Sequence, residues 1–331
     1  MTKKQPSPSQ DQPEFPGLKP LGELLPIIKK PSRIKSRLIE TGIAIAEEDP
    51  TDLYFQHSVF CQAGMPYRDP GDEQREWERR QGRTSLLIEA GRARHPETGD
   101  WIKLGLPFGP KPRLILAYLN TAALRTGKSE IEVEDSLTAF VNRLRLDPGG
   151  HTIRTVKDQL ARLSAATVRL GFLADHQSAS QSINVNASII GAFDLWLTKD
   201  DRQRILWPST VQLSLDYFNS LQKHAVPLDE RALTALSHSA MGLDVYSWLA
   251  QRLHRVDSRK PQFIPWTALK DQFGWRYGTM FKFKQVFRHT LTQVLIEYRG
   301  ARVELDGKGM TLRNSPPPIK GRYAVLLPPT K

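Results

Sequence analysis

The stretch TMFKFKQVFRHTLTQVLIEYRGARVELDGKGMTLR, residues 279–313, carries the clearest structural signal in this chain. In its first half, apolar residues recur every three or four positions, which predicts a helix with one buried face. That apolar stripe consists of Phe283, Val286 or Phe287, Leu291, Val294 and Tyr298. The polar residues elsewhere on the helix are Lys282, Lys284, Gln285, Arg288, His289 and Thr292. In the second half, alternating apolar residues around Asp306-Gly307 predict a β-hairpin.

Two further helices are predicted upstream of this stretch. One spans about residues 230–253. The other is PWTALKDQF, residues 265–273, where Pro265 suits a first turn and Gly274 suits a C-terminal cap. Helix, short helix, turn, helix and hairpin is the element order of a winged helix-turn-helix unit.

The same order of elements occurs about 120 residues earlier. The elements are a helix over residues 111–126, helical stretches at 137–144 and after His151, and strands in TVRLGF (167–172) and SINVNAS (182–188). Extra strands are predicted as a hairpin between residues 84 and 106 and as the pair DLWLT (194–198) and RILWP (204–208). The expected fold is therefore α+β, with two tandem winged helix-turn-helix domains, of which the first carries extra β-hairpins.

Proline content and element order divide the chain. Residues 1–50 hold eight prolines and little periodicity, which predicts a flexible, Pro-rich basic arm. The segment HAVPLDE, residues 224–230, is the expected junction between domains. We therefore place the first winged-helix domain at residues 51–225, the second at residues 226–315, and a tail at residues 316–331.

The charge of the chain is concentrated at one end. The 331 residues carry a formal net charge of +12, and residues 258–331 alone hold 14 Lys and Arg against 4 Asp and Glu. Such an excess is typical of a surface that faces polyphosphate, although a membrane surface or an acidic protein would also match it.

The sequence indicates a cytoplasmic protein that does not enter a membrane. No apolar run approaches the roughly 20 residues that a bilayer requires, and the N-terminus lacks the apolar segment of a secretory signal. Cys61 is the single cysteine, so no intrachain disulfide can form.

Double-stranded DNA is the partner that these basic segments predict, because Lys, Arg, Gln and His reach phosphates and the major-groove edges of guanine and adenine. The candidates on the C-terminal helix, the turn before it and the hairpin after it are Lys282, Lys284, Gln285, Arg288, His289, Arg276, Tyr277, Arg302, Lys308 and Arg313. The first domain offers Arg154, Thr155, Lys157 and Arg162, a weaker set because Asp158 interrupts its basic face. The competing interpretation is an amphipathic helix whose polar side is only solvated.

No catalytic centre, metal site or cofactor is expected, and the protein is predicted not to be an enzyme. Gly127-Lys128-Ser129 resembles the end of a phosphate-binding loop, but Ala122 stands where that motif needs a glycine. The eight histidines have no paired spacing that suits zinc. Glu132, Glu134 and Asp135 are better explained as an acidic helix start than as the metal ligands of a nuclease.

Several stretches closely resemble the plasmid-encoded RepA replication initiators. They are FGPKPRLILAYLN, SLTAFVNRL, HTIRTVKDQLARLSAATVRLGF, VQLSLDYFNSLQKHAVPLDERALTALSHSAMGLDVYSWLAQRLHRV, KPQFIPWTALKDQFG and VELDGKGMTLRNSPPP. The resemblance runs from about Tyr54 to Pro318 and leaves out the first 50 residues.

The resemblance implies a replication initiator that binds direct repeats at a plasmid origin, helps to open the duplex, and recruits host replication initiation and helicase-loading proteins. Related initiators have two winged helices, of which the second reads the major groove and the first serves partly in dimerisation, so a homodimer is a further expectation. Carried onto this chain, the second reading helix contains Lys282, Lys284, Gln285 and Arg288. Two alternatives remain: a repressor of its own operon that binds a palindromic operator, and an origin-nicking nuclease.

Overall fold

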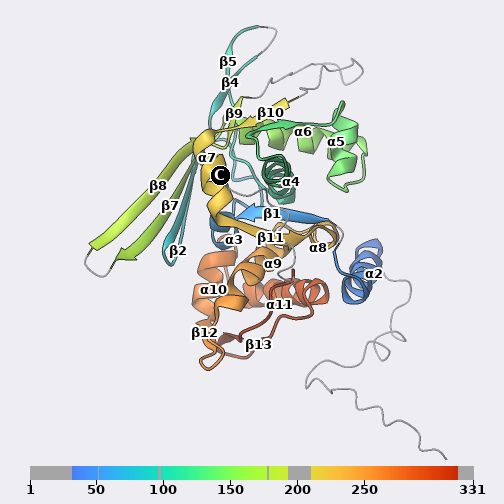
Figure 1. Ribbon diagram of the computed structural model, residues 1–331, viewed down its shortest axis with the longest axis vertical. Coiled ribbons are helices and arrows are strands. Elements are labelled where there is room, and N and C mark those ends of the chain that lie inside the picture. The colour runs from blue at the N-terminus through green and yellow to red at the C-terminus, as the bar shows by residue number, and fades with distance from the viewer. Residues whose placement is uncertain (1–31, 51, 96–97, 177–178, 193–209, 320–331) are drawn as a thin grey trace, which may run out of the picture.

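The computed structural model describes residues 32–50, 52–95, 98–176, 179–192 and 210–319. Over these residues, helices alternate with short antiparallel sheets, which confirms the α+β class. Figure 1 places α4 (Pro110–Thr126) in the upper part of the molecule and α9 (Ala240–Arg252) in the lower part, with β1 and β11 between them. Among the described helices, none combines the length and apolar character needed to cross a bilayer.

The C-terminal elements follow the predicted order, with a 3-10 helix and a strand that the sequence did not predict before the short helix. After α9 and the short 3-10 helix Leu253–Arg255 come β12 (Gln262–Pro265), α10 (Trp266–Phe273), α11 (Met280–Glu297), β13 (Val303–Leu305) and β14 (Gly309–Leu312). β14 lies between β12 and β13 in an antiparallel sheet. α11 begins where the hydroxyl of Thr279 accepts a hydrogen bond from the Lys282 backbone N–H at 3.3 Å, which fixes its first turn.

An aromatic cluster holds α10 and α11 together. Phe283 and Phe287 of α11 are fully buried, and Trp266 and Phe273 of α10 face them. The rings of Trp266 and Phe287 meet edge to face at 5.8 Å, and Trp248 of α9 meets Phe273 in the same way at 5.2 Å. These contacts bury large apolar surfaces in a fixed geometry, so they set how α11 sits on the rest of the unit.

The helix predicted over residues 230–253 is interrupted. The structure has α8 (Glu230–Ala235) and then α9, with a tight turn between them. The Ser237 N–H donates to the Thr234 carbonyl, and the Ser239 hydroxyl accepts from the Gly242 N–H as the N-cap of α9. A serine side chain that bonds a nearby backbone group, as Ser239 does, favours a helix start over a helix interior. The apolar spacing continues across this break and therefore does not reveal it.

Residues 51–225, the predicted first domain, are called the first unit below, and residues 226–315 the second unit. The first unit contains its three predicted helices. These are α4, α5 (Leu137–Arg143) and α6 (Gly150–Ala165), with the short strand β6 (Glu130–Glu132) after α4. α4 ends at Gly127, whose φ of +68° lies in the left-handed region that glycine tolerates best.

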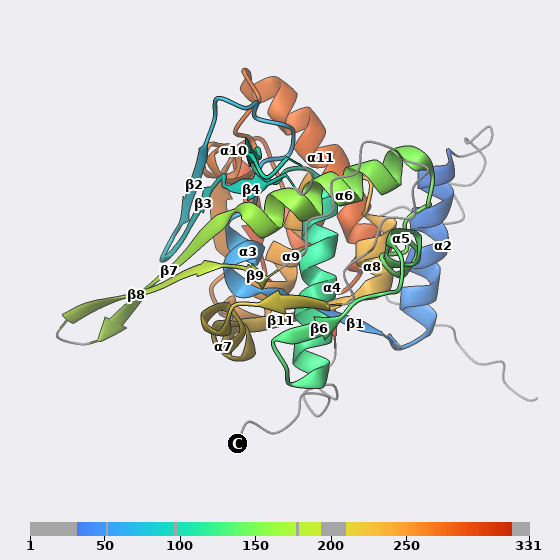
Figure 2. The ribbon, with the colours of Figure 1, turned by 90° about the horizontal axis from the view of Figure 1, so that it is seen from above.

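The strands of the first unit pair differently from the prediction. β7 (Thr167–His176) and β8 (Ala179–Ser188) form the expected hairpin, which Figure 2 shows reaching away from the helices. The predicted hairpin between residues 84 and 106 is only partly correct, because β4 (Arg92–Arg94) pairs with β5 (Trp101–Lys103) while β3 (Thr84–Glu89) pairs with β2 (Glu76–Gln81) and β7. The reason is burial: Leu86 and Ile88 of β3 face the core, which a solitary hairpin would leave exposed.

A further small sheet completes this unit. β10 (Thr210–Leu213) pairs with both β6 and β9 (Ile190–Ala192). The predicted strand pair at 194–198 and 204–208 lies outside the described residues.

The segment predicted as the domain junction is a paired strand. After α7 (Leu215–His224), β11 (Ala225–Asp229) pairs along its full length with β1 (Leu53–His57). Val226 and Leu228 are buried, and α3 (Ser58–Gln62) packs against α9. The predicted boundary at residue 225 therefore falls among contacts that join the two units, and the division into two domains stays a prediction.

The predicted flexible arm over residues 1–50 is wrong for its last third. Residues Arg33–Glu47 form helix α2, which packs against α8 and α11. The prolines stand before residue 32 and at residue 50, so nothing between them prevents a helix. Gly42 lets α2 approach α11 closely, because a Cβ there would stand 2.6 Å from Cγ2 of Ile296. Residues 1–31 lie outside the described part of the chain.

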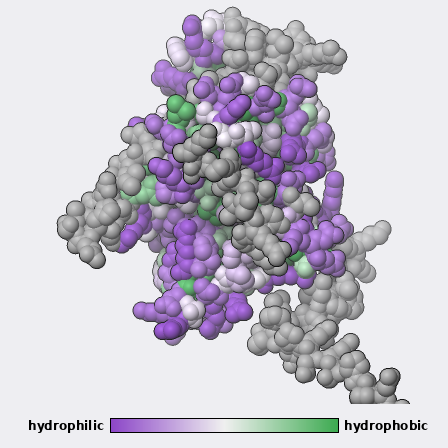
Figure 3. Space-filling model, viewed as in Figure 1, coloured by the Kyte–Doolittle hydropathy of each residue, from purple (hydrophilic) through white to green (hydrophobic). Residues whose placement is uncertain are grey.

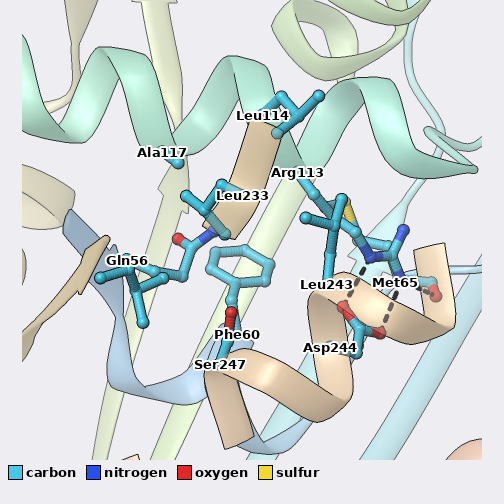
Figure 4. A pocket seen from close by; sticks show the side chains of 12 residues that line it. Gln56, Phe60, Met65, Arg113, Leu114, Ala117, Leu233, Leu243, Asp244 and Ser247 are labelled. Atoms are coloured by element: carbon cyan, nitrogen blue, oxygen red, sulfur yellow. Dashed lines mark hydrogen bonds and ion pairs between the residues drawn. The ribbon is translucent and has the colours of Figure 1, made fainter. Parts of the chain in front are cut away.

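A buried ion pair joins α4 of the first unit to α9 of the second. The Arg113 guanidinium donates to both oxygens of Asp244, at 2.6 and 2.8 Å, as Figure 4 shows. It also donates to the carbonyls of Met65 at 2.7 Å and Gly109 at 2.6 Å. Both side chains are almost fully enclosed, so the pair is held by hydrogen bonds that compensate for the loss of water.

Candidate nucleic-acid interface

Five of the fourteen predicted DNA-binding residues lie on α11, on the side away from the core. Lys282, Gln285, Arg288 and His289 are exposed, and Lys284 is half-buried. They lie opposite the buried side chains Phe283, Phe287, Leu291 and Val294. The helix thus separates an apolar face from a basic one, as its sequence predicts.

Trp266 lies beneath two of these cations. Nζ of Lys284 stands 5.1 Å from the centre of the indole ring, and Cζ of Arg288 stands 5.2 Å from it. Trp266 is only 3% exposed, so the ring is a fixed surface for both side chains. Its Nε1–H donates to the Asp306 carbonyl at 3.1 Å, and Lys284 Nζ donates to the Gly307 carbonyl at 3.3 Å. These contacts limit the positions of the two cations and tie them to the hairpin turn.

The turn between β13 and β14 is ordered by its own aspartate. The Asp306 carboxylate accepts from the N–H groups of Gly309 and Lys308, both at 2.7 Å, and these bonds lower the pKa of Asp306. Gly309 is required here because a Cβ would stand 2.1 Å from the Ile264 carbonyl oxygen. The turn therefore presents the exposed Lys308 from a rigid backbone.

The other two predicted DNA-binding residues of this hairpin differ in whether an acidic side chain pairs with them. Arg302 is exposed. Arg313 forms a two-pronged ion pair with Glu304, at 2.9 and 3.2 Å, on the neighbouring strand. That pair raises the pKa of Arg313 and lowers the pKa of Glu304. Arg313 therefore brings less net charge to the surface than the sequence suggests.

The turn before α11 is packed against the first unit. Arg276 donates to the Asp69 carbonyl at 3.0 Å, and its guanidinium lies 5.0 Å from the ring of Trp275. Tyr277 is partly buried against Phe283. Arg276 has an exposed guanidinium with a fixed direction, whereas Tyr277 mainly supports the first turn of α11.

Acidic side chains are kept away from the exposed face of α11. Of the four acidic residues between 258 and 319, Glu297 is buried, Glu304 pairs with Arg313, Asp306 bonds its own turn, and Asp271 is exposed on α10. Among the described residues, no carboxylate lies within ion-pair distance of Lys282, Lys284, Arg288 or Lys308. Figure 3 shows mostly hydrophilic surface in the lower part of the molecule, where Figure 1 places β12 and β13.

The corresponding helix of the first unit, α6, has fewer exposed and unpaired basic side chains than α11. Arg154 is exposed, Lys157 is half-buried, and the Thr155 hydroxyl donates to the His151 carbonyl at 2.8 Å. Arg162 is engaged inside the protein: it donates to Asp158 at 3.0 Å and lies 5.1 Å from the ring of Phe108. Arg162 was predicted as a DNA-binding residue on the basic face of this helix, but its side chain is only 15% exposed.

The loop that contains Asp69 contacts predicted DNA-binding residues of both units. The Asp69 carboxylate lies 3.8 Å from Arg162, while the Asp69 carbonyl accepts from Arg276. The loop that contains Asp69 therefore contacts both the end of α6 and the turn before α11.

Two residues of this surface were not predicted from the sequence. Trp266 had no signal, because its contacts with Lys284 and Arg288 cross 18 or more positions of the chain. Arg79 of β2 lies 4.5 Å from the ring of Trp77 and 5.8 Å from that of Trp275, beside the turn before α11. The basic run around it, ERRQGR, was a usable signal.

No cluster of three or more His, Cys, Asp or Glu side chains suitable for a metal ion occurs among the residues that the structure describes. The prediction that the protein is not an enzyme remains a prediction.

Comparisons with known proteins give a match to a family model and distant similarity to solved structures. The family model described as "Plasmid encoded RepA protein" matches residues 106–268, from just before α4 to the start of α10. The comparison with curated proteins finds no match.

Two solved structures of domains 2 and 3 of RctB are similar to the chain at low identity. The selenomethionine form covers 78% of this chain and 98% of that chain, with 10% sequence identity and a TM-score of 0.49. The other covers 82% of this chain and 94% of that chain, with 11% identity and a TM-score of 0.42. Likeness at this level carries no functional argument, so the assignment rests on sequence. The sequence match is to the plasmid-encoded RepA family, over residues 106–268.

Proposed function

We propose that this protein initiates plasmid replication by binding duplex DNA at the origin through two winged helices. In this proposal α11 enters the major groove and the turn between β13 and β14 contacts the adjacent backbone. The match of residues 106–268 to the plasmid-encoded RepA family supports the role in replication. The order α9, β12, α10, α11, β13 and β14, with β14 central in the sheet, supports the winged helix.

The observation that carries the proposal is the arrangement on Trp266. Lys284 and Arg288 lie over one buried indole ring that is itself bonded to the hairpin turn, and Lys308 projects from that turn. Two cations from the helix are thereby held in a defined spacing, beside a third that the ordered turn of the hairpin carries. Groups that are fixed before binding lose less conformational freedom on contact with phosphates or bases.

The first unit has a second role in this proposal. Its α6 has fewer free cations, and β2 and β8 are the two edge strands of its four-stranded sheet. An edge strand can pair with another chain, so this unit suits pairing with a second copy of the protein as well as weaker DNA contact. Recruitment of host replication initiation and helicase-loading proteins completes the proposal and follows from the family.

Footprinting of the purified full chain on the intergenic DNA of its plasmid tests the proposal. A reagent for unpaired bases is applied in parallel, and the Lys284→Ala/Arg288→Ala variant is the control. We expect protection of regularly spaced direct repeats and melting of adjacent A·T-rich DNA, both lost in the variant.

Three other outcomes contradict the proposal. Protection of a single palindrome without melting identifies a repressor. Metal-dependent nicking of the same DNA identifies a nuclease. Equal footprints from the wild type and the variant remove α11 from the interface.

A further inference from the structure

Phe281 is the most exposed of the large apolar side chains that the structure describes. It is 78% exposed, compared with 64% for Trp101 and Leu215. It stands at the second position of α11, immediately before Lys282. Single exposed apolar residues are common on protein surfaces, so exposure alone does not assign a role.

The position of Phe281 on the helix gives the second observation. Phe281, Gln285, Arg288 and Thr292 follow one another at intervals of four, three and four residues, so they lie along one line of the helix surface. All four are exposed. That line runs along the middle of the face opposite the buried stripe, with Lys282 and His289 beside it.

Phe281 is not needed for the core of its own unit. Phe283, two residues later, is fully buried and already packs against Trp266, Tyr277 and Phe287. The Thr279 cap fixes the backbone of the first turn, so Phe281 is carried by an ordered helix. An aromatic ring is thus held in water on a face otherwise made of hydrogen-bonding and charged side chains.

We propose that Phe281 is a base-contacting residue that packs against the C5-methyl group of a thymine in the major groove. This inference rests on the proposed function. A phenylalanine reads thymine through that methyl group, glutamine reads adenine by two hydrogen bonds, and arginine reads guanine in the same way. The line of Phe281, Gln285 and Arg288 therefore selects a site in which a thymine lies at one end of the bases that Gln285 and Arg288 contact.

The test begins with selection of duplexes from a randomised pool by the full-length wild type. In the selected duplex, each thymine is then replaced in turn by uracil, which removes only the methyl group. We expect one position at which uracil weakens wild-type binding about fourfold, the effect of exposing one buried methyl-sized group. Phe281→Ala should bind the thymine duplex about tenfold or more weakly and should not distinguish thymine from uracil at that position.

Leu215→Ala is the matched control, because Leu215 is an equally apolar, highly exposed residue on α7, outside the proposed interface. It should bind as the wild type does. Circular dichroism and thermal unfolding of Phe281→Ala should match the wild type, because an exposed side chain contributes little to the core.

The outcomes separate this inference from the proposed function. If the wild type enriches no sequence, the proposed function fails and the inference fails with it. If the wild type enriches a sequence and Phe281→Ala keeps the same affinity or the same response to uracil, the inference alone is overturned. Loss of binding to a protein partner with unchanged DNA binding would also overturn it.

Discussion

The helices α6 and α11 occupy equivalent places in the order of elements but present different surfaces. Each follows a short helix and precedes a β-hairpin, and each has an apolar and a basic face. On α6, Arg162 is turned back to Asp158 and Phe108. On α11, Lys284 and Arg288 rest on Trp266 and have no carboxylate partner among the described residues. Basic residues in a sequence are therefore available to a ligand only where the neighbouring elements leave them without an acidic partner.

The largest expected effect comes from breaking the ion pair that joins the two units. Arg113→Met leaves the Asp244 carboxylate buried without its cation, so the free energy of unfolding should fall by about 3 to 5 kcal/mol. Urea unfolding followed by tryptophan fluorescence and by circular dichroism measures the loss. Arg113→Met/Asp244→Leu is the control and should recover most of it. Two separate transitions in the wild type would show that the units unfold independently, contrary to their shared contacts.

The next largest effect is a difference in DNA affinity between variants of α11 and variants of α6. Lys284→Ala/Arg288→Ala should weaken binding by about 1 to 3 kcal/mol for each residue that contacts a base or phosphate, and each lost phosphate contact should lower the salt slope by about 0.9. The matched Arg154→Ala/Lys157→Ala variant of α6 should lose less than about 1 kcal/mol. Titrations at several salt concentrations give both quantities. Equal losses from the two helices would mean that both units read DNA with similar strength.

The C-terminal end of α11 should make stability depend on pH. Glu297 is buried with no hydrogen-bond partner for its carboxyl oxygens, and burial together with the charge of Asp229 raises its pKa to about 8. The folded state therefore holds this proton more tightly than the unfolded state. Its contribution to stability is complete below the unfolded pKa and declines as pH rises, by at most about 1.4 kcal/mol per pH unit between roughly pH 5 and 8.

Thermal unfolding at a series of pH values measures this slope. Glu297→Gln should flatten it and should be more stable than the wild type near pH 8. Glu40→Gln makes the same carboxylate-to-amide change at an exposed position of α2 and is the matched control, which should keep the wild-type slope. An unchanged slope in Glu297→Gln would place the pH dependence elsewhere.

The smallest effect concerns the arginine that α6 turns inward. Arg162→Ala removes a charged hydrogen bond and a cation–π contact, so it should lower the free energy of unfolding by about 1 kcal/mol. DNA affinity should change less than twofold. Arg154→Ala, at an exposed position of the same helix, should leave stability unchanged. A large loss of DNA affinity in Arg162→Ala would mean that Arg162 contacts DNA after all.

Much of the C-terminal unit was predictable, because its signals are local. Helix α11 follows from apolar spacing, its start from Thr279, and the hairpin from Asp306-Gly307. The break between α8 and α9 and the helix α2 were missed. The break was missed because two serines form turn hydrogen bonds inside a continuous apolar period. Helix α2 was missed because the prolines around it dominate the composition of residues 1–50.

Local periodicity within the sequence determined most helices, the exposed basic face of α11 and the position of its hairpin, since each depends on residues a few positions apart. Tertiary structure alone decided that β1 pairs with β11, that Arg113 meets Asp244 across 131 positions, and that Trp266 lies under Lys284 and Arg288. It also decided that Arg162 turns inward, so that α6 and α11 differ. The physical reason is that the partner of a side chain is often a residue far away in the chain, which folding brings beside it. The spacing of residues along the sequence does not contain the distance between two such groups.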